Sequence, residues 1–127
     1  MGKGFKSLIV WEKARDLAVD VHQVTGLGRF KQDYGLTDQM RRSAVSVPSN
    51  ISEGNERDTD KEAIRFFYIA KGSLAELRTQ LDIANRINYL DEEKFRNLDE
   101  KAVIIGKMLG SLIKARSQNP KPIAHRP

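Results

Sequence analysis

The segment from Thr59 to Tyr89 carries the pattern that most limits what this chain can fold into. Thr59 and Glu62 have the spacing of a capping box, and apolar residues then recur at intervals of three or four positions. Only an α-helix brings residues with this spacing to one face, so we predict a helix over residues 59–89, about 45 Å long. Its apolar stripe consists of Ala63, Phe67, Ala70, Leu74, Leu77, Leu81 and Ala84.

Three further segments repeat this spacing and predict helices over residues 8–24, 37–54 and 91–116. Gly26 and Gly28 suit the end of the first helix, and Asp91 with the two glutamates that follow it suits the start of the last. The stripes are Val10, Ala14, Leu17, Val21 and Val24, then Met40, Ala44, Val47 and Ile51, then Phe95, Leu98, Ala102, Ile105, Leu109 and Leu112.

The stretch RRSAVSVPSNISEGNER, residues 41–57, allows two interpretations. Val45 and Val47 at alternate positions fit an edge strand that ends at Pro48. A period of 3.6 residues instead gives one apolar face and one polar stripe, and we favour this helical interpretation. Pro48 then lies inside a helix, where it removes a backbone hydrogen bond, costs about 3 kcal/mol and should kink the helix.

This second helix has candidate residues for its two ends and for the kink. We expect Thr37 to be its N-cap and Gly54 its C-cap. The side chain of Asn50 can bond backbone groups that the kink leaves free. Spacing alone explains Glu53 as a partner of Arg57 four positions on. The predicted structural motif is therefore Pro48, Asn50, Glu53 and Gly54.

Four amphipathic helices with short connections predict an all-α fold, an antiparallel up-down four-helix bundle with a kinked second helix, in one domain over residues 1–116. Residues 117–127 contain three prolines and predict a disordered basic tail. Apolar residues beside the stripes indicate surface buried against other subunits. They are Phe66, Ile69, Ile83, Ile87, Val103, Ile104 and Ile113.

Composition excludes several classes of protein. No apolar run approaches the roughly 18 residues of a membrane span, and the N-terminus lacks a secretory signal, so we expect a cytoplasmic protein that does not enter a membrane. The chain has no cysteine, which removes disulfides, thiolate metal sites and cysteine nucleophiles. Neither His22 nor His125 has a ligand partner at metal-binding spacing. We therefore expect no enzyme, no metal and no cofactor.

The distribution of charge keeps one functional interpretation open. The net charge is +5, and from Lys101 onward every charged residue is basic. Complementation of a helix dipole and a surface for a polyanion explain this gradient about equally well. The candidate nucleic-acid-binding residues are Arg41, Arg42, Arg57, Lys61, Arg65, Lys107, Lys114 and Arg116, and Lys71 belongs to the same basic set. Solvated helix faces and pairs at i,i+4 are the alternative.

Tyr34, Phe66 and Tyr68 could stack on bases, although such aromatics more often lie in a core or an interface.

Three stretches give the chain a family resemblance: LIVWEKARDLA at 8–18, YGLTDQMRRSAVSVPSNISEGNER at 34–57 and FFYIAKGSLAELRTQLDIA at 66–84. Over about residues 5–115 it resembles the four-helix-bundle proteins encoded in intervening sequences of bacterial 23S rRNA genes. That family is related to the accessory protein of diversity-generating retroelements. The resemblance implies a ring-like homo-oligomer, a pentamer where the size is known, with nucleic-acid association and a reverse transcriptase partner in the retroelement branch. It implies no enzyme.

These observations lead to a prediction of function with one main alternative. We predict a non-catalytic, homo-oligomeric nucleic-acid-binding accessory protein, with RNA favoured over DNA. The alternative is a structural or adaptor oligomer that binds a protein partner. A nuclease-like enzyme is the third hypothesis, and it would need a catalytic Glu53.

Overall fold

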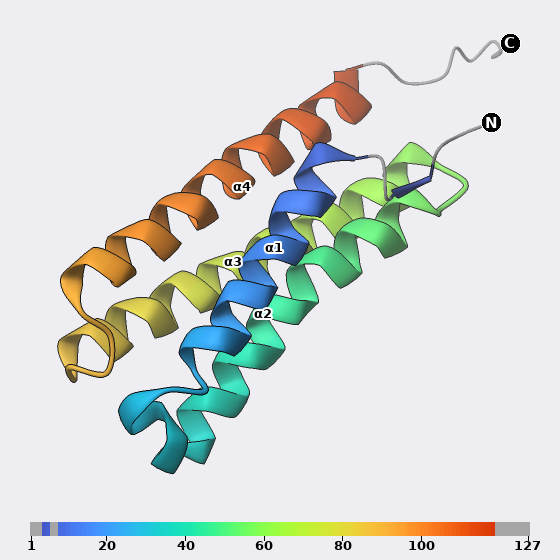
Figure 1. Ribbon diagram of the computed structural model, residues 1–127. Helices are drawn as coiled ribbons and strands as arrows, with labels where there is room; N and C mark the ends of the chain where they lie inside the picture. Colours follow the sequence, from blue (N-terminus) through green and yellow to red (C-terminus); the bar gives the residue numbers. More distant parts are fainter. Residues whose placement is uncertain (1–3, 6–7, 119–127) are drawn as a thin grey trace, which may run out of the picture.

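The computed structural model describes residues 4–5 and 8–118, and its helices form an antiparallel bundle (Figure 1). Helix α1 spans Ile9–Val24, α2 Tyr34–Asn55, α3 Asp60–Arg86 and α4 Glu92–Gln118, and a short 3₁₀ helix, η2, spans Gly28–Gln32. Each helix packs against the next along the chain, and α4 closes the bundle against α1. The described residues contain no strand. The predicted up-down four-helix bundle is therefore confirmed.

Side-chain caps fix the starts of three helices. The Oδ1 atom of Asp33 accepts a hydrogen bond from the backbone N–H of Leu36 at 3.1 Å, at the start of α2. The hydroxyl of Thr59 accepts one from the N–H of Glu62 at 3.2 Å, as the capping box predicts. At the start of α4, Asp91 accepts one from the N–H of Lys94 at 2.8 Å. Each cap satisfies a donor that the first helical turn leaves free.

The predicted stripes form the core. All seven stripe residues of α3 and all four of α2 are buried, whereas Val24, Phe95 and Leu112 are only partly buried at the margins of the core. Ile113, which we expected at a subunit surface, is 6% exposed and belongs to the core. That expectation was wrong because α4 turns this residue toward the interior of the bundle, where it packs with Leu109 in the same cluster.

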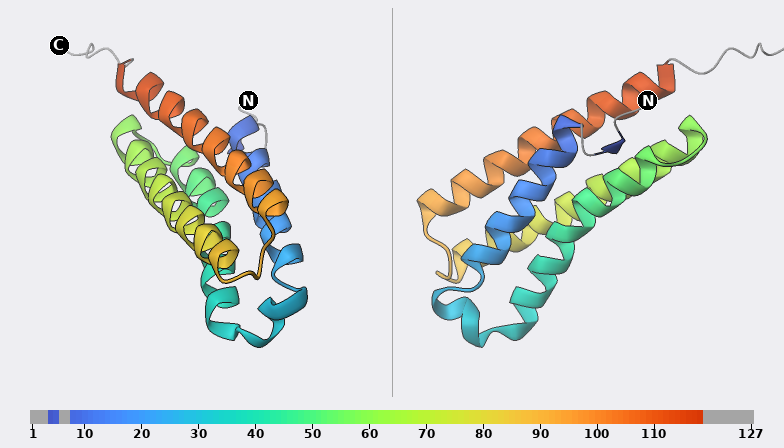
Figure 2. Two further views of the ribbon diagram at one scale, coloured as in Figure 1. Left: turned by 90° about the vertical axis from the view of Figure 1, so that its left-hand side faces the viewer. Right: turned by 45° about the vertical axis from the view of Figure 1, so that its right-hand side comes forward.

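Pro48 lies inside a continuous α2 and is buried. The right-hand view of Figure 2 shows α2 bending along its length. The Nδ2 atom of Asn50 donates to the backbone oxygen of Ser46 at 2.8 Å and to its hydroxyl oxygen at 3.0 Å. The hydroxyl of Ser46 is in turn 2.8 Å from that of Ser73 on α3. Asn50 therefore bonds the backbone at Ser46, beside the proline, whereas the oxygen that Pro48 leaves without its helical donor is that of Ala44. The same group of hydroxyls joins α2 to α3.

Two details predicted for α2 were wrong. Thr37 is not the N-cap, because Asp33 caps the helix four residues earlier than expected, and the hydroxyl of Thr37 donates to the oxygen of Phe30 at 2.9 Å. Gly54 is not the C-cap, because α2 continues to Asn55. A Cβ on Gly54 would lie 2.8 Å from Cε1 of Phe67 and 3.0 Å from the backbone oxygen of Ala63. Gly54 is therefore required for the close approach of α2 and α3.

The predicted end of α1 at Val24 is confirmed, and the other remaining boundaries differ by one to three residues from those predicted. Helix α3 ends at Arg86 rather than at Tyr89, because Asn88 adopts a left-handed conformation with φ of 67° and the chain turns there toward α4. Helix α4 continues through residues 117 and 118, which we had assigned to the tail. The rest of the predicted tail, residues 119–127, lies outside the described residues. Along the part of the chain that is described, no helix is long and apolar enough to cross a membrane.

Candidate nucleic-acid interface

The α3–α4 pair divides along its length into two halves that differ in charge. We call residues 60–75 of α3 and 102–117 of α4 the basic half. It carries six basic side chains and two acids, Asp60 and Glu62. We call residues 76–86 and 92–101 the mixed half, which carries five bases and six acids. Antiparallel packing sets this register, because Arg116 pairs with Asp60 at one end of the two helices and Arg78 with Asp99 toward the other.

Three lysines gather on the basic half, and we call them the lysine patch: Lys71, Lys107 and Lys114. The Nζ atom of Lys71 lies 3.9 Å from the point where a Cβ on Gly110 would stand, so Lys71 extends across the surface of α4. Lys107 and Lys114 are three and four positions from Gly110, on the same side of α4. All three lysines are exposed, and none forms an ion pair with an acid in the described parts of the chain.

The first turns of α3 add further positive charge. Lys61 and Arg65 are exposed and also lack an acidic partner among the described residues. Arg57, in the preceding turn, pairs with Glu53 at 2.7 Å and lies 4.5 Å from the centre of the Phe66 ring. Arg65 approaches the same ring at 5.8 Å. Stacking on Phe66 holds both guanidinium groups near the surface while leaving donors for a ligand.

Arg41 and Arg116 are held by contacts inside the protein. Arg41 donates to the hydroxyl of Thr25 at 2.9 Å and to the backbone oxygen of His22 at 3.1 Å, and so completes the C-terminal end of α1. Arg116 reaches Asp60 at 3.3 Å, with its side chain 28% exposed. Some guanidinium donors of Arg41 and Arg116 are therefore occupied by acceptors of the protein itself, whereas the lysine patch has no ion-paired acid among the described residues.

Arg42 stands apart from the other candidates. It pairs with Asp38 at 3.0 Å on the outer face of α2, and its side chain remains 79% exposed. The structure therefore brings together Lys61, Arg65, Lys107 and Lys114 with Lys71 on one half of the α3–α4 pair, and it places Arg41 and Arg42 on α2.

His22 and Glu53, the candidate metal-binding and catalytic residues in the described parts of the chain, both contact groups close to them in sequence. No group of three or more His, Cys, Asp or Glu side chains there could hold a metal ion. The Nδ1 atom of His22 lies 3.2 Å from the backbone oxygen of Ala18, within its own helix. His125 lies outside the described residues. Glu53 is exposed and paired with Arg57, as its spacing predicted.

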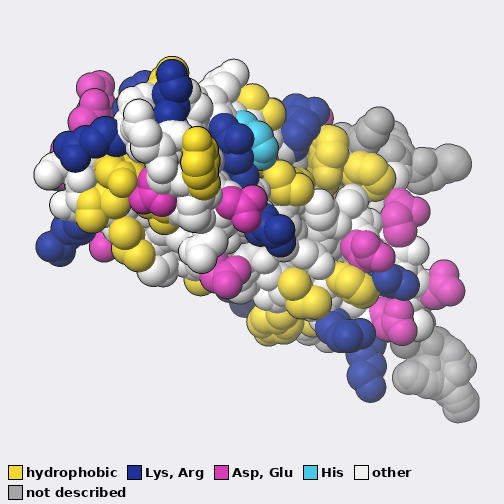
Figure 3. All heavy atoms as spheres, turned by 90° about the horizontal axis from the view of Figure 1, so that it is seen from below, with side chains coloured by type: hydrophobic (Ala, Val, Ile, Leu, Met, Phe, Trp, Pro, Cys, Tyr) yellow, Lys and Arg dark blue, Asp and Glu magenta, His cyan; other side chains and the backbone are white. Residues whose placement is uncertain are grey.

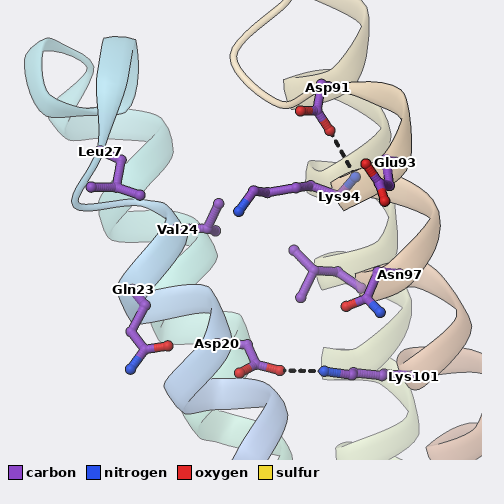
Figure 4. A pocket seen from close by; sticks show the side chains of 10 residues that line it. Asp20, Gln23, Val24, Leu27, Asp91, Glu93, Lys94, Asn97 and Lys101 are labelled. Atoms are coloured by element: carbon purple, nitrogen blue, oxygen red, sulfur yellow. Dashed lines mark hydrogen bonds and ion pairs between the residues drawn. The ribbon is translucent and has the colours of Figure 1, made fainter.

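A cleft of about 570 Å³ lies between α1 and α4, beside the mixed half (Figure 4). Its charged residues come from both helices, and Lys101 of α4 donates to Asp20 of α1 at 2.8 Å across it. Asp91, at the rim, accepts the backbone N–H of Lys94. With acids and bases mixed along its walls, the cleft offers a polyanion no surface of one sign.

The fold and this charge distribution define a small basic four-helix-bundle protein. More specifically, the chain belongs to the 23S rRNA-intervening sequence protein family, whose family model matches residues 6–111. The family predicted from the three sequence stretches is thus confirmed.

The fold is also found in solved structures. The crystal structure of a protein of unknown function, from the S23 ribosomal protein family of Bacteroides thetaiotaomicron, superposes with a TM-score of 0.77. It is 23% identical in sequence, and the match covers 84% of this chain and 99% of that one. Among curated proteins, none matches the sequence.

Proposed function

We propose that this protein is a non-catalytic, homo-oligomeric accessory protein that binds RNA through the basic half of the α3–α4 pair. The observation that carries the proposal is the lysine patch, because three exposed ammonium groups lie together and none is ion-paired with an acid among residues 4–5 and 8–118. Phosphate is the ligand that such a surface attracts most generally. The family name, 23S rRNA-intervening sequence protein, names no ligand, so the preference for RNA over DNA is part of the proposal.

The charge of the whole chain supports the same proposal. A net charge of +5 draws any polyanion toward the protein, while the mixed half presents no uniform potential. Repeating the basic half around a ring multiplies the number of phosphates that one RNA can contact, so weak individual contacts add up.

We propose that the oligomer is a ring of copies of this chain, with five as the expected number. One candidate contact surface is a hollow of about 510 Å³ between α1 and α2, where Val19 and Val45 are 48% and 44% exposed beside Pro48. Figure 3 shows hydrophobic side chains near the histidine that borders this hollow. A second surface is at the C-terminal end of α3, where Ile83 and the C-cap residue Ile87 are 45% and 39% exposed. Two different apolar surfaces are what a head-to-tail ring requires.

Fluorescence anisotropy with labelled RNA tests the binding. The protein is titrated against a structured RNA and a DNA duplex at about 50 mM and about 200 mM salt, where several phosphate contacts predict at least about a tenfold loss of affinity. Tight, salt-dependent binding that favours RNA supports the proposal. Absence of binding to either nucleic acid at low salt contradicts it and leaves the adaptor oligomer as the function to pursue.

Light scattering coupled to size-exclusion chromatography tests the ring. We expect a mass of about five times the 14.4 kDa of one chain. The double variant Val19→Glu with Val45→Glu should lower that mass, because it places charge in the apolar hollow. Leu27→Glu is the matched control, since Leu27 is 59% exposed outside the hollow and its substitution should leave the mass unchanged. A monomeric wild-type protein at micromolar concentration would remove the ring from the proposal.

A further inference from the structure

We infer that Tyr68 is a stacking platform for an unpaired nucleobase, and that Gly72 keeps its ring open. The inference rests on the proposed RNA binding and names the kind of RNA that the basic half selects. It concerns an exposed aromatic side chain that the folding of the protein itself does not explain.

Tyr68 is 58% exposed on the outer face of α3. Among the described residues, its ring has no aromatic or cation partner and its hydroxyl has no hydrogen-bond partner. Tyr89 provides the contrast, because its hydroxyl donates to Asp33 at 3.0 Å and its ring packs edge-on against Phe30. A large ring left in water without any such contact is available to a ligand.

Gly72 explains why the ring of Tyr68 is uncovered. Side chains of an α-helix lean toward its N-terminus, so the residue at i+4 covers the side chain at i. Position 72 is i+4 from Tyr68, and glycine there provides no covering atoms. A Cβ at Gly72 would meet nothing within 4 Å, so packing inside the protein does not require glycine, although glycine disfavours the helix. At Gly54, by contrast, a Cβ would clash with Phe67.

The residues around Tyr68 suit an RNA strand. Lys61 and Arg65 precede it by seven and three positions and Lys71 follows it by three, which places all three on the outer side of α3 or at its border with α4. A nucleobase stacked on Tyr68 would therefore have cations on both sides for its phosphates. Tyr34 is also exposed, at 80%, but it lies between Asp33 and Asp38, which repel phosphate.

Such a site distinguishes unpaired from paired nucleotides. Bases in a duplex already stack on one another and cannot lie flat on a protein ring, whereas bases of a single strand or a loop can. Stacking on an aromatic ring does not depend on base identity, because every base has a π face. We therefore expect a preference for single-stranded over duplex RNA with little sequence specificity.

The test compares Tyr68→Ala, Tyr68→Phe and Tyr34→Ala by fluorescence anisotropy. The probes are an unstructured RNA of about 15 nucleotides and an RNA duplex of the same length. We expect Tyr68→Ala to weaken binding of the single strand about fivefold to a hundredfold and to change duplex binding by less than about twofold. Tyr68→Phe keeps the ring and Tyr34→Ala lies in acidic surroundings, so both should bind as wild type. The salt dependence should not change, because Tyr68→Ala removes no phosphate contact.

Gly72 provides an independent test, because it separates folding from binding. Gly72→Met should raise the thermal stability, since methionine favours the helix and has space at this position. The same side chain should cover Tyr68 and weaken single-strand binding by at least about fivefold. Gly72→Ala is the control, which should also be more stable but should bind as wild type because a methyl group is too short to cover the ring.

Several results would overturn the inference. Unchanged single-strand affinity in Tyr68→Ala, with salt-dependent RNA binding retained, refutes the platform and leaves the proposed function standing. A lower oligomer mass in Tyr68→Ala places Tyr68 in a subunit contact and likewise refutes it. Wild-type protein that binds no RNA at low salt removes both the proposed function and the platform.

Discussion

The two halves of the α3–α4 pair use their basic residues differently. In the mixed half, Arg78 donates to both carboxylate oxygens of Asp99, at 2.7 and 3.1 Å, and Lys101 reaches Asp20 at 2.8 Å. In the basic half, only Arg116 has such a partner, while the lysine patch has none among the described residues. Arg78 and Lys101 therefore join neighbouring helices in the mixed half, whereas the lysine patch remains available to a ligand in the basic half. The difference depends on which acids the fold brings near each basic side chain.

Charge reversal of the whole lysine patch should produce the largest effect. The triple variant with Lys71, Lys107 and Lys114 changed to glutamate should lose about a hundredfold in RNA affinity at low salt. Its slope of log affinity against log salt should fall by about three, one unit for each lost phosphate contact. Fluorescence anisotropy over a series of salt concentrations measures both quantities.

A matched triple in the mixed half is the control for this prediction. Arg86, Lys94 and Arg96 are exposed, and their change to glutamate alters the net charge by the same amount. Affinity should fall by less than about fivefold, because only the long-range field changes. Equal losses in the two triples would contradict the comparison between the halves and reduce RNA binding to an effect of total charge.

Gly54→Ala should lower the stability of the protein by disturbing the contact between α2 and α3, without changing its affinity for RNA. The new Cβ would lie 2.8 Å from Phe67 and 3.0 Å from the oxygen of Ala63, and a backbone atom cannot give way as a flexible side chain can. We expect the free energy of unfolding to fall by about 2 to 3 kcal/mol, as measured by urea denaturation. RNA affinity of the folded fraction should stay within about twofold, because no phosphate ligand changes. An unchanged stability would show that α2 and α3 can separate at little cost.

Single alanine substitutions should show the opposite roles of the two halves. Arg78→Ala removes a paired group that is nearly half exposed, so it should cost only about 0.5 to 1 kcal/mol of stability and leave RNA binding unchanged. Lys107→Ala should leave the stability unchanged within about 0.5 kcal/mol and weaken RNA binding a few-fold. Denaturant titration measures the stability of both variants, and fluorescence anisotropy measures their RNA affinity. A binding loss in Arg78→Ala as large as that in Lys107→Ala would contradict it.

The sequence predicted the helices better than their ends. The stripe of α3 was fully predictable, because seven apolar residues at helical spacing determine both the helix and its buried face. The start of α2 was missed, since Thr37 and Asp33 are both suitable caps and only contacts with Phe30 and Tyr89 distinguish them. Gly54 was read as a helix end because a glycine required by a neighbouring helix has the same sequence signal as a C-cap.

The sequence identified the basic residues of the candidate site, but it did not show which of them lie together on one surface. Arg41 looked available because its acceptors, Thr25 and His22, are 16 and 19 positions away in sequence. The approach of Lys71 to Gly110 depends on the register of α3 against α4, which periodicity within each helix does not determine. Whether a cation is available to a ligand depends on the acceptors that the fold brings near it, and these can be distant in sequence, as they are for Arg41.

The smallest predicted effect concerns the turn that closes the mixed half. The hydrogen bond from Tyr89 to Asp33 raises the pKa of the Tyr89 hydroxyl above 10.0, with smaller contributions from burial and the Asp33 charge, while Arg29 opposes the shift. Because the folded state holds this proton more tightly, the stabilisation is fully present below about pH 10 and is lost as pH rises through the raised pKa. The free energy of unfolding should therefore fall more steeply above about pH 10 in wild type than in Tyr89→Phe. Denaturant titrations of both proteins at several pH values measure the difference. Parallel pH profiles would show that the hydrogen bond does not stabilise the turn.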